Sequence, residues 1–164
     1  MKNIIAVFLF MGGINLAAAD PTVTGSPPIL PNNTLTPGVV NKGATKDMIC
    51  TPGYSSSVRH VTQKTKDFVY KQYGIVYHQP GDYEIDHLIS LELGGSNDQK
   101  NLWPQSYKTQ PWNAHVKDKL ENKLHDMVCD GELELQDAQD MIAKDWVGAY
   151  CKIFNANCNG DNAP

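Results

Sequence analysis

The stretch from Glu84 to Pro104 constrains the fold of this chain more than any other segment. It contains the adjacent pair Asp86-His87, then Gly94-Gly95, and finally Asn101 ahead of Leu-Trp-Pro. The residues before the glycines mix apolar and polar positions in a run that suits a β-strand, and glycines permit the positive φ angles of a tight return. We therefore expect a strand, a turn and a second strand, with Asn101 brought back near His87.

These residue types match what a site that hydrolyses phosphodiesters with the help of a metal requires, and we expect such a site here. Such a reaction needs a base that deprotonates water and a divalent cation that neutralises charge on the phosphate and leaving oxygens. Asp86 and His87 together supply a metal ligand and a base. The carboxamide of Asn101 is expected either to orient the imidazole or to brace the loop that carries it.

The same segment resembles the HNH, or ββα-metal, endonucleases. The resemblance rests on the spacing of Asp86-His87, Gly94-Gly95 and Asn101-Leu102, followed by a helical segment. Carried over by position, it implies that Asp86 binds the metal, that His87 is the general base and that Asn101 supports His87. More loosely, residues 49–150 resemble exported bacterial members of that family. An ordinary surface hairpin is the competing interpretation, because short motifs also occur by chance.

What this resemblance implies is a metal-dependent endonuclease. Its expected substrate is DNA, with RNA as an alternative, and its sequence specificity is expected to be low. Its expected cofactor is Mg²⁺ or another divalent cation, with no organic cofactor. The alternative, from a different class, is a secreted, disulfide-stabilised binding module that keeps the fold without catalysis. We expect a monomer without stable membrane association, and nothing in the sequence points to a particular protein partner.

The second protein ligand of the metal is less well defined. Family members take it from the helix after the second strand, where this chain offers Asn113, His115, Asp118 and Glu121. At about 100° per residue, Asn113 and Glu121 lie in or beside the apolar stripe of that helix, whereas the other two point away. We therefore expect Asn113 and Glu121 as metal ligands. Glu84 is either a third ligand or the partner of Arg59, and the pairing is favoured.

The N-terminal region reads as a leader and an arm. A lone Lys2, an apolar run over residues 4–11 and three alanines at 17–19 predict a secretory signal peptide over residues 1–19. Residues 20–46 are rich in Pro, Thr, Asn and Gly, which predicts a flexible arm. The folded nuclease-like domain is expected over residues 47–164. We therefore expect an exported protein, periplasmic or secreted.

The four cysteines all follow the predicted signal peptide. In an oxidising compartment they indicate two disulfides, for which three connectivities exist. We favour Cys50 with Cys129, which staples the N-terminal segment to a helix, and Cys151 with Cys158, which closes a short tail. A structural zinc site is the alternative, but it needs close Cys or Cys/His pairs, and the nearest two cysteines are seven positions apart.

Periodicity predicts an α+β domain in which helices flank the hairpin. We expect helices over residues 64–73, 112–129 and 135–150, and an additional strand over residues 75–77. The first helix should turn Phe68, Val69 and Tyr73 inward. The stripes of the other two helices are expected to form the core: Trp112, Val116, Leu120, Leu124 and Met127 in one, and Leu135, Ala138, Ile142, Trp146 and Ala149 in the other.

The net charge of −4 is unusual for an enzyme that acts on nucleic acid. Basic residues are nevertheless concentrated in residues 58–72 and 99–125. We expect Arg59, Lys100 and Lys117 to contact the substrate, with weak and strongly salt-dependent binding. The remaining histidines, expected at the surface, are His60, His78 and His125.

Overall fold

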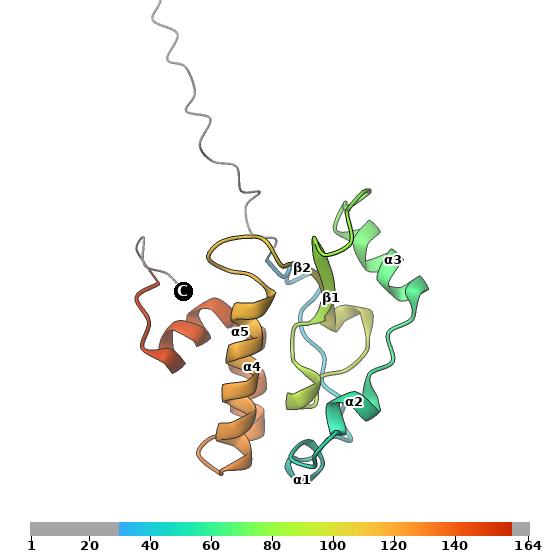
Figure 1. Cartoon of the computed structure of the whole chain (residues 1–164). Coiled ribbons are helices and arrows are strands. Elements are labelled where there is room, and N and C mark those ends of the chain that lie inside the picture. Colours follow the sequence, from blue (N-terminus) through green and yellow to red (C-terminus); the bar gives the residue numbers. More distant parts are fainter. Residues whose placement is uncertain (1–29, 159–164) are drawn as a thin grey trace, which may run out of the picture.

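The computed structural model describes residues 30–158, so the predicted signal peptide lies outside the described residues. These residues form an α+β fold with five helices and a two-stranded antiparallel sheet (Figure 1). In chain order the elements are α1 (Lys46–Ile49), α2 (Tyr54–Val58), α3 (Gln63–Gln72), β1 (Tyr83–His87), β2 (Leu102–Ser106), α4 (Ala114–Cys129) and α5 (Leu135–Phe154). Two 3₁₀ turns, η1 (Leu91–Leu93) and η2 (Gln99–Asn101), lie between the strands.

The hairpin is sandwiched between helices. β1 and β2 pair with Glu84 opposite Gln105 and Asp86 opposite Trp103. Because side chains alternate along a strand, these four point to one face, and that face meets α4 and α5. Ile85 and the neighbouring alternate positions point to the other face, which packs on α3. The sheet therefore holds Asp86 and His87 on opposite faces at the end of β1.

The predicted helices form close to their expected bounds, and their apolar stripes meet in the main core. Buried side chains from α4 and α5 include Val116, Leu120, Leu124, Val128, Ala138, Ile142, Trp146 and Ala149. Val128 rather than Met127 faces inward at the end of α4, because the buried positions recur every fourth residue. On α3, Val69 is buried as expected, but the prediction for Phe68 was wrong because this residue is exposed.

Two expected extended segments are not strands. Residues 75–77, predicted as a strand, belong instead to the loop between α3 and β1. The β-compatible run after His87 also leaves the sheet, and Leu91–Leu93 forms the turn η1, at whose start the Ser90 hydroxyl accepts from the Glu92 N–H. Apolar side chains are buried in this turn although the backbone is not extended. The apolar pattern of this segment therefore predicted the burial of its side chains correctly, but its extended backbone incorrectly.

The described part of the expected flexible arm is packed on the domain. Thr36 is fully buried, and its hydroxyl donates to the carbonyl of Leu102 at 2.8 Å. Val40 bridges Gly95, and the N–H of Ser96 donates to the carbonyl of Val39 at 2.9 Å. The folded domain therefore begins before the predicted boundary at residue 47. Prolines exclude regular structure here, but the backbone groups still find partners in the loop between β1 and β2.

Both expected disulfides are present. Cys50 at the end of α1 joins Cys129 at the end of α4, and Cys151 joins Cys158. Disulfides of this kind are typical of an extracellular or other oxidising environment. His125 lies beside the first disulfide, half-buried, with its Nε2 3.1 Å from the carbonyl of Ile49.

Among residues 30–158, the chain has no helix with the length and apolar character needed to span a bilayer.

Candidate active site

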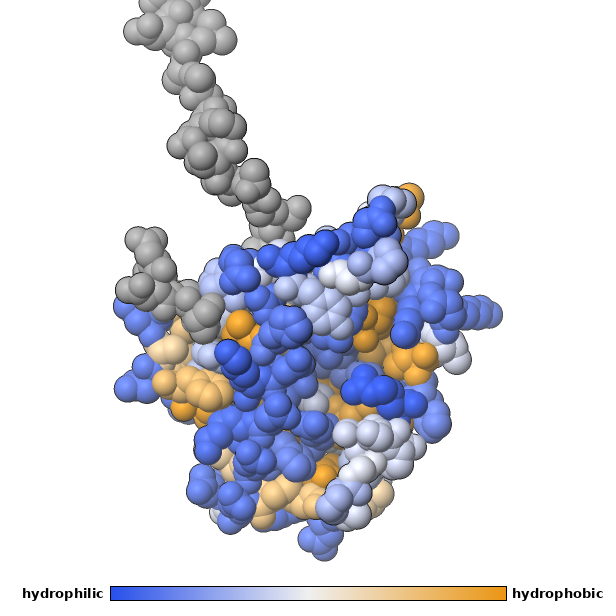
Figure 2. All heavy atoms as spheres, in the orientation of Figure 1, coloured by the Kyte–Doolittle hydropathy of each residue, from blue (hydrophilic) through white to orange (hydrophobic). Residues whose placement is uncertain are grey.

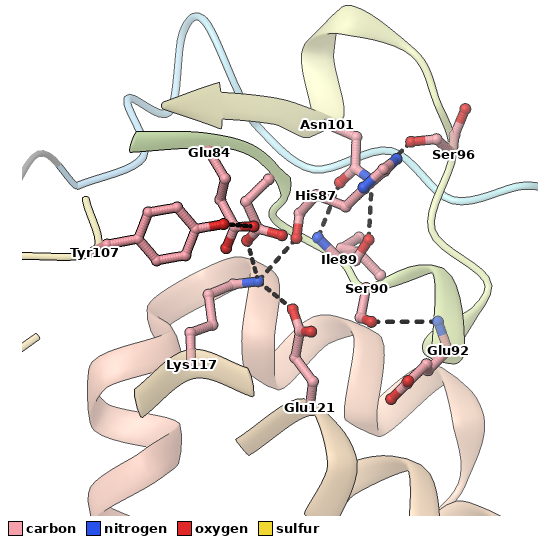
Figure 3. Close-up of polar contacts among 11 residues, drawn as sticks. Glu84, His87, Ile89, Ser90, Glu92, Ser96, Asn101, Tyr107, Lys117 and Glu121 are labelled. Atoms are coloured by element: carbon pink, nitrogen blue, oxygen red, sulfur yellow. Dashed lines mark hydrogen bonds and ion pairs between the residues drawn. The ribbon is translucent and has the colours of Figure 1, made fainter. Parts of the chain in front are cut away.

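The side chain of Asn101 braces the loop between the two strands, and its hydrogen bonds go to loop residues rather than to His87. Its fully buried carboxamide accepts from the N–H of Ile89 at 2.9 Å and from that of Val39 at 3.3 Å. It donates to the carbonyls of Ile89 and Ser96, both at 2.9 Å (Figure 3). All of its hydrogen-bonding capacity is thereby used. Of the two roles expected for Asn101, it performs the second.

The two glycines let this loop close. Gly94 has a φ of 73°, in the left-handed region that favours glycine. A Cβ atom on Gly95 would lie 1.8 Å from the carbonyl oxygen of Ile89, so no side chain fits there. The pair therefore brings Ser96 and Asn97 up against the end of β1.

His87 is buried, and its tautomer is set by Asn97. The Nε2 atom of His87 lies 3.1 Å from Asn97 Oδ1. The Asn97 Nδ2 group donates to the carbonyl of Val58 at 2.7 Å, and Oδ1 also accepts from the N–H of His60, so the oxygen is the atom that faces the imidazole. Nε2 therefore carries the proton and donates it to Asn97. The lone pair of a neutral His87 is then on Nδ1.

The surroundings of His87 favour its neutral form. Burial lowers the pKa of His87, opposed by the Asn97 hydrogen bond and by the negative charge of Asp86. The nearby cations Arg59 and Lys117 lower it further. The net shift is below the ordinary histidine value of about 6.5. Asn97 was not singled out from the sequence, although its position two residues after the glycine pair was a usable signal.

Asp86 is held by a lysine from α4. The buried ammonium of Lys117 donates to Asp86 Oδ2 at 2.7 Å, to the carbonyl of His87 at 2.8 Å and to Glu121 (Figure 3). Burial alone lowers the pKa of Lys117, but Asp86 and Glu121 outweigh it and raise the pKa above the ordinary range. The prediction that Lys117 contacts the substrate was therefore wrong, because its side chain is buried and its ammonium is bound inside the protein. Glu121, expected as a metal ligand, is bound to the same lysine as Asp86.

Asn113, expected as a metal ligand, is instead the N-cap of α4. Its Oδ1 accepts from the N–H of Val116 at 3.2 Å, and its Nδ2 donates to the carbonyl of Thr109 at 3.1 Å. Asparagine is among the preferred N-cap residues because its side-chain oxygen satisfies a free N–H of the first turn. The helix begins at Ala114, later than predicted, and this shift changes the role of Asn113.

Glu84 is bound to a tyrosine and not to Arg59. The hydroxyl of Tyr107 donates to Glu84 Oε2 at 2.7 Å. Burial and the neighbouring charge of Asp86 raise the pKa of Glu84 above its ordinary value. Asp118 is exposed, as expected, but desolvation and Asp86 also raise its pKa. Negative charge is therefore in excess on this face.

Gln105 adds an unsatisfied polar group to the same face. This residue lies opposite Glu84 in the hairpin and is 2% exposed. Neither Oε1 nor Nε2 of Gln105 has a hydrogen-bond partner within the described part of the chain. A buried amide without partners is rare in folded proteins. Among the described residues, Gln105 therefore offers two unpartnered polar atoms directly across the hairpin from Glu84.

The residues on this face fit a hard divalent cation in their chemistry. Carboxylate and amide oxygens are the donors that Mg²⁺ and Ca²⁺ prefer, and Mg²⁺ is often held by one or two carboxylates together with waters. The oxygens of Glu84, Asp86 and Gln105 are of this kind. Among the His, Cys, Asp and Glu side chains of residues 30–158, one group of three has ligand atoms within 4.8 Å of one another. It consists of Cys50, His125 and Cys129, and the two cysteine sulfurs of this group are joined in a disulfide.

The remaining expected substrate contacts are at the surface. Arg59 and Lys100 are both exposed. The positive charge of Arg59 acts on His87 at the end of β1 and on Asp118 of α4. Its guanidinium therefore lies within electrostatic range of both residues.

No family model, no curated protein and no solved structure matches this chain. Function has to be inferred from the site itself.

Proposed function

We propose that this protein is a divalent-metal-dependent endonuclease that hydrolyses the phosphodiester bonds of DNA, with RNA as a further substrate, and that it has little sequence specificity. The observation that carries this proposal is the state of His87. Its protonated nitrogen is committed to Asn97, and its pKa is lowered, so Nδ1 is a free base at neutral pH. It directly follows Asp86, a carboxylate suited to a metal.

In this proposal His87 takes a proton from the attacking water at Nδ1. A general base needs to be unprotonated and held in a fixed direction. Burial supplies the first condition, and the hydrogen bond from Nε2 to Asn97 Oδ1 supplies the second. Asn101 acts one step further out, by holding the loop that carries Asn97.

Asp86 would hold the divalent cation, together with Glu84 and Gln105. The bound cation would neutralise charge on the phosphate and on the leaving 3′ oxygen. Lys117 keeps Oδ2 of Asp86 engaged, so that Oδ1 is the atom left for a ligand. Glu121, proposed from the sequence as a ligand, contributes instead through its contact with Lys117.

Arg59 is the residue best placed to bind the scissile phosphate. It is exposed, and its charge acts on both His87 and Asp118. Lys100, within η2, adds a second exposed cation. With a net charge of −4 on the chain, binding rests on these local cations and weakens steeply with salt. The disulfides support export to an oxidising compartment, where we place this activity.

Plasmid cleavage tests this proposal. The purified protein should nick and then degrade plasmid DNA with Mg²⁺ and should be inactive with a chelator. His87→Ala should abolish cleavage, whereas His60→Ala, at an exposed histidine, should retain it. Circular dichroism and the melting temperature verify that both variants are folded. Cleavage by folded His87→Ala at the wild-type rate refutes the assignment, and a folded wild type without activity under any metal favours the non-catalytic binding module.

A further inference from the structure

The loop between α3 and β1 presents apolar surface to solvent. Within this tip loop (residues 74–82), Val76 is 99% exposed and Tyr77 is 78% exposed. Figure 2 shows the end of this loop as a small hydrophobic point that projects above a mostly hydrophilic surface. Single exposed apolar residues are common, and here two such residues stand side by side at a projecting tip.

The tip loop is held firmly at its base. The ring of His78 stacks on Tyr70 of α3, with centroids 4.1 Å apart, and meets Tyr83 of β1 edge-on. The N–H of Gln79 donates to the Asp82 carboxylate, which also pairs with Lys108 at 2.6 Å. His78 is therefore a structural residue and not the free surface histidine that we expected. The exposure of Val76 and Tyr77 is built into the fold.

The neighbouring outer surface of α3 is basic. Lys64, Phe68 and Lys71 follow one another at spacings of four and three residues and are all exposed, so they share one side of the helix. Val69, on the opposite side, is buried against the hairpin. Cations alternating with an aromatic ring match the chemistry of a single nucleic-acid strand, which offers phosphates and flat bases.

We propose that the tip loop and the outer side of α3 form the strand-binding surface of this protein, with Tyr77 stacking on an unpaired base and Lys64 and Lys71 meeting the backbone phosphates. This inference rests on the proposed nuclease function and names the form of its substrate, a single-stranded or locally melted segment. β1 leads directly from the tip loop to Asp86 and His87, over roughly 13 Å from Tyr83 to His87. One strand of nucleic acid can span that distance.

The test measures the binding of a fluorescein-labelled single-stranded oligonucleotide by fluorescence anisotropy. A chelator is present so that no cleavage occurs. Tyr77→Ala should weaken binding by about 5- to 150-fold, the range found when a stacking ring is removed. Tyr77→Phe should bind like the wild type because the ring is retained. Lys71→Ala should reduce the slope of log Kd against log salt concentration by about 0.7, the value for one lost phosphate contact on a single strand. Met48→Ala, at an exposed apolar residue of α1, should change neither quantity.

Two further measurements separate this inference from the nuclease proposal. Hydrolysis of bis(p-nitrophenyl) phosphate reports the chemistry without a base to stack on, and Tyr77→Ala should leave it unchanged. If the protein has no hydrolytic activity but its oligonucleotide binding depends on Tyr77, the nuclease proposal is refuted and the strand-binding surface is retained. If Tyr77→Ala binds oligonucleotides and cleaves them with the wild-type Kd and kcat/KM, the proposed strand-binding surface is wrong. It is also wrong if the tip loop binds a protein and the chain does not bind oligonucleotides.

Discussion

The ammonium of Lys117 lies 2.7 Å from the carboxylate of Asp86, although the two residues are 31 positions apart in the chain. The same ammonium also contacts Glu121 and the carbonyl of His87. One buried cation thereby ties α4 to the end of β1. It also fixes the orientation of the carboxylate that we propose as the metal ligand.

Replacing this lysine should destabilise the protein strongly. Lys117→Met leaves Asp86 and Glu121 as buried acids without their cation, and removing one partner of a buried ion pair costs about 3–5 kcal/mol. Lys119→Met, at an exposed lysine of the same helix, should change the free energy of unfolding by less than about 0.5 kcal/mol. Urea unfolding followed by circular dichroism measures both. Equal stabilities would show that the buried contacts of Lys117 do not form in solution.

The pH dependence of cleavage should report His87. The base has to be neutral, so activity rises with pH through the pKa of His87, and burial places this midpoint below about 6.5. The Asn97 hydrogen bond opposes that shift, so Asn97→Ala should move the midpoint to still lower pH. The same variant should lose about 10-fold or more in kcat, because the ring is no longer held in its tautomer. The control is Asn122→Ala on the exposed side of α4. A midpoint above 6.5 in the wild type would contradict the role of burial.

Divalent cations should stabilise the fold, and more so at neutral than at acid pH. Burial and Asp86 raise the pKa of Glu84, so the folded state without metal retains protons that the unfolded state loses. That contribution to stability is present at acid pH and is lost as the pH rises through the folded pKa. A cation bound to the ionised carboxylates restores it. Differential scanning calorimetry should show Mg²⁺ raising the Tm near neutral pH in the wild type and having little effect in Asp86→Ala. An equal Mg²⁺ effect in both would place the metal elsewhere.

The two disulfides should contribute unequally to stability. The bond between Cys50 and Cys129 closes a loop with a sequence separation of 79, and that between Cys151 and Cys158 a separation of 7. From loop-closure entropy, these correspond to about 4.5 and about 2.4 kcal/mol. The paired alanine variants, compared by urea unfolding, should therefore differ by about 2 kcal/mol. Thiol titration of the native protein should find no free thiol, and a reactive thiol would exclude one of the two bonds.

The sequence by itself determined the features that depend on short-range geometry. The glycine pair predicted the return of the chain because only glycine fits at Gly95, where the carbonyl of Ile89 lies against the backbone. The apolar spacing in α4 and α5 predicted most of the residues that form the core, with Val128 in place of Met127, since a helix repeats its direction about every 3.6 residues. The cysteine pairing was also predicted correctly, because one pair closes a short tail and the other joins two helices.

Tertiary structure alone decided which partner each polar side chain found. Periodicity gives the direction of a side chain from its own helix or strand, but not what another element places opposite it. Lys117 lies beside the apolar stripe of α4, where a lysine ordinarily reaches water, and it is buried because β1 brings Asp86 above it. Asn113 is an N-cap because α4 begins at the residue after it. Asn97 is the partner of His87 because the closed loop between the strands brings it to the end of β1. A buried polar group takes whichever partner the fold supplies, because leaving it unpaired costs more than any local preference.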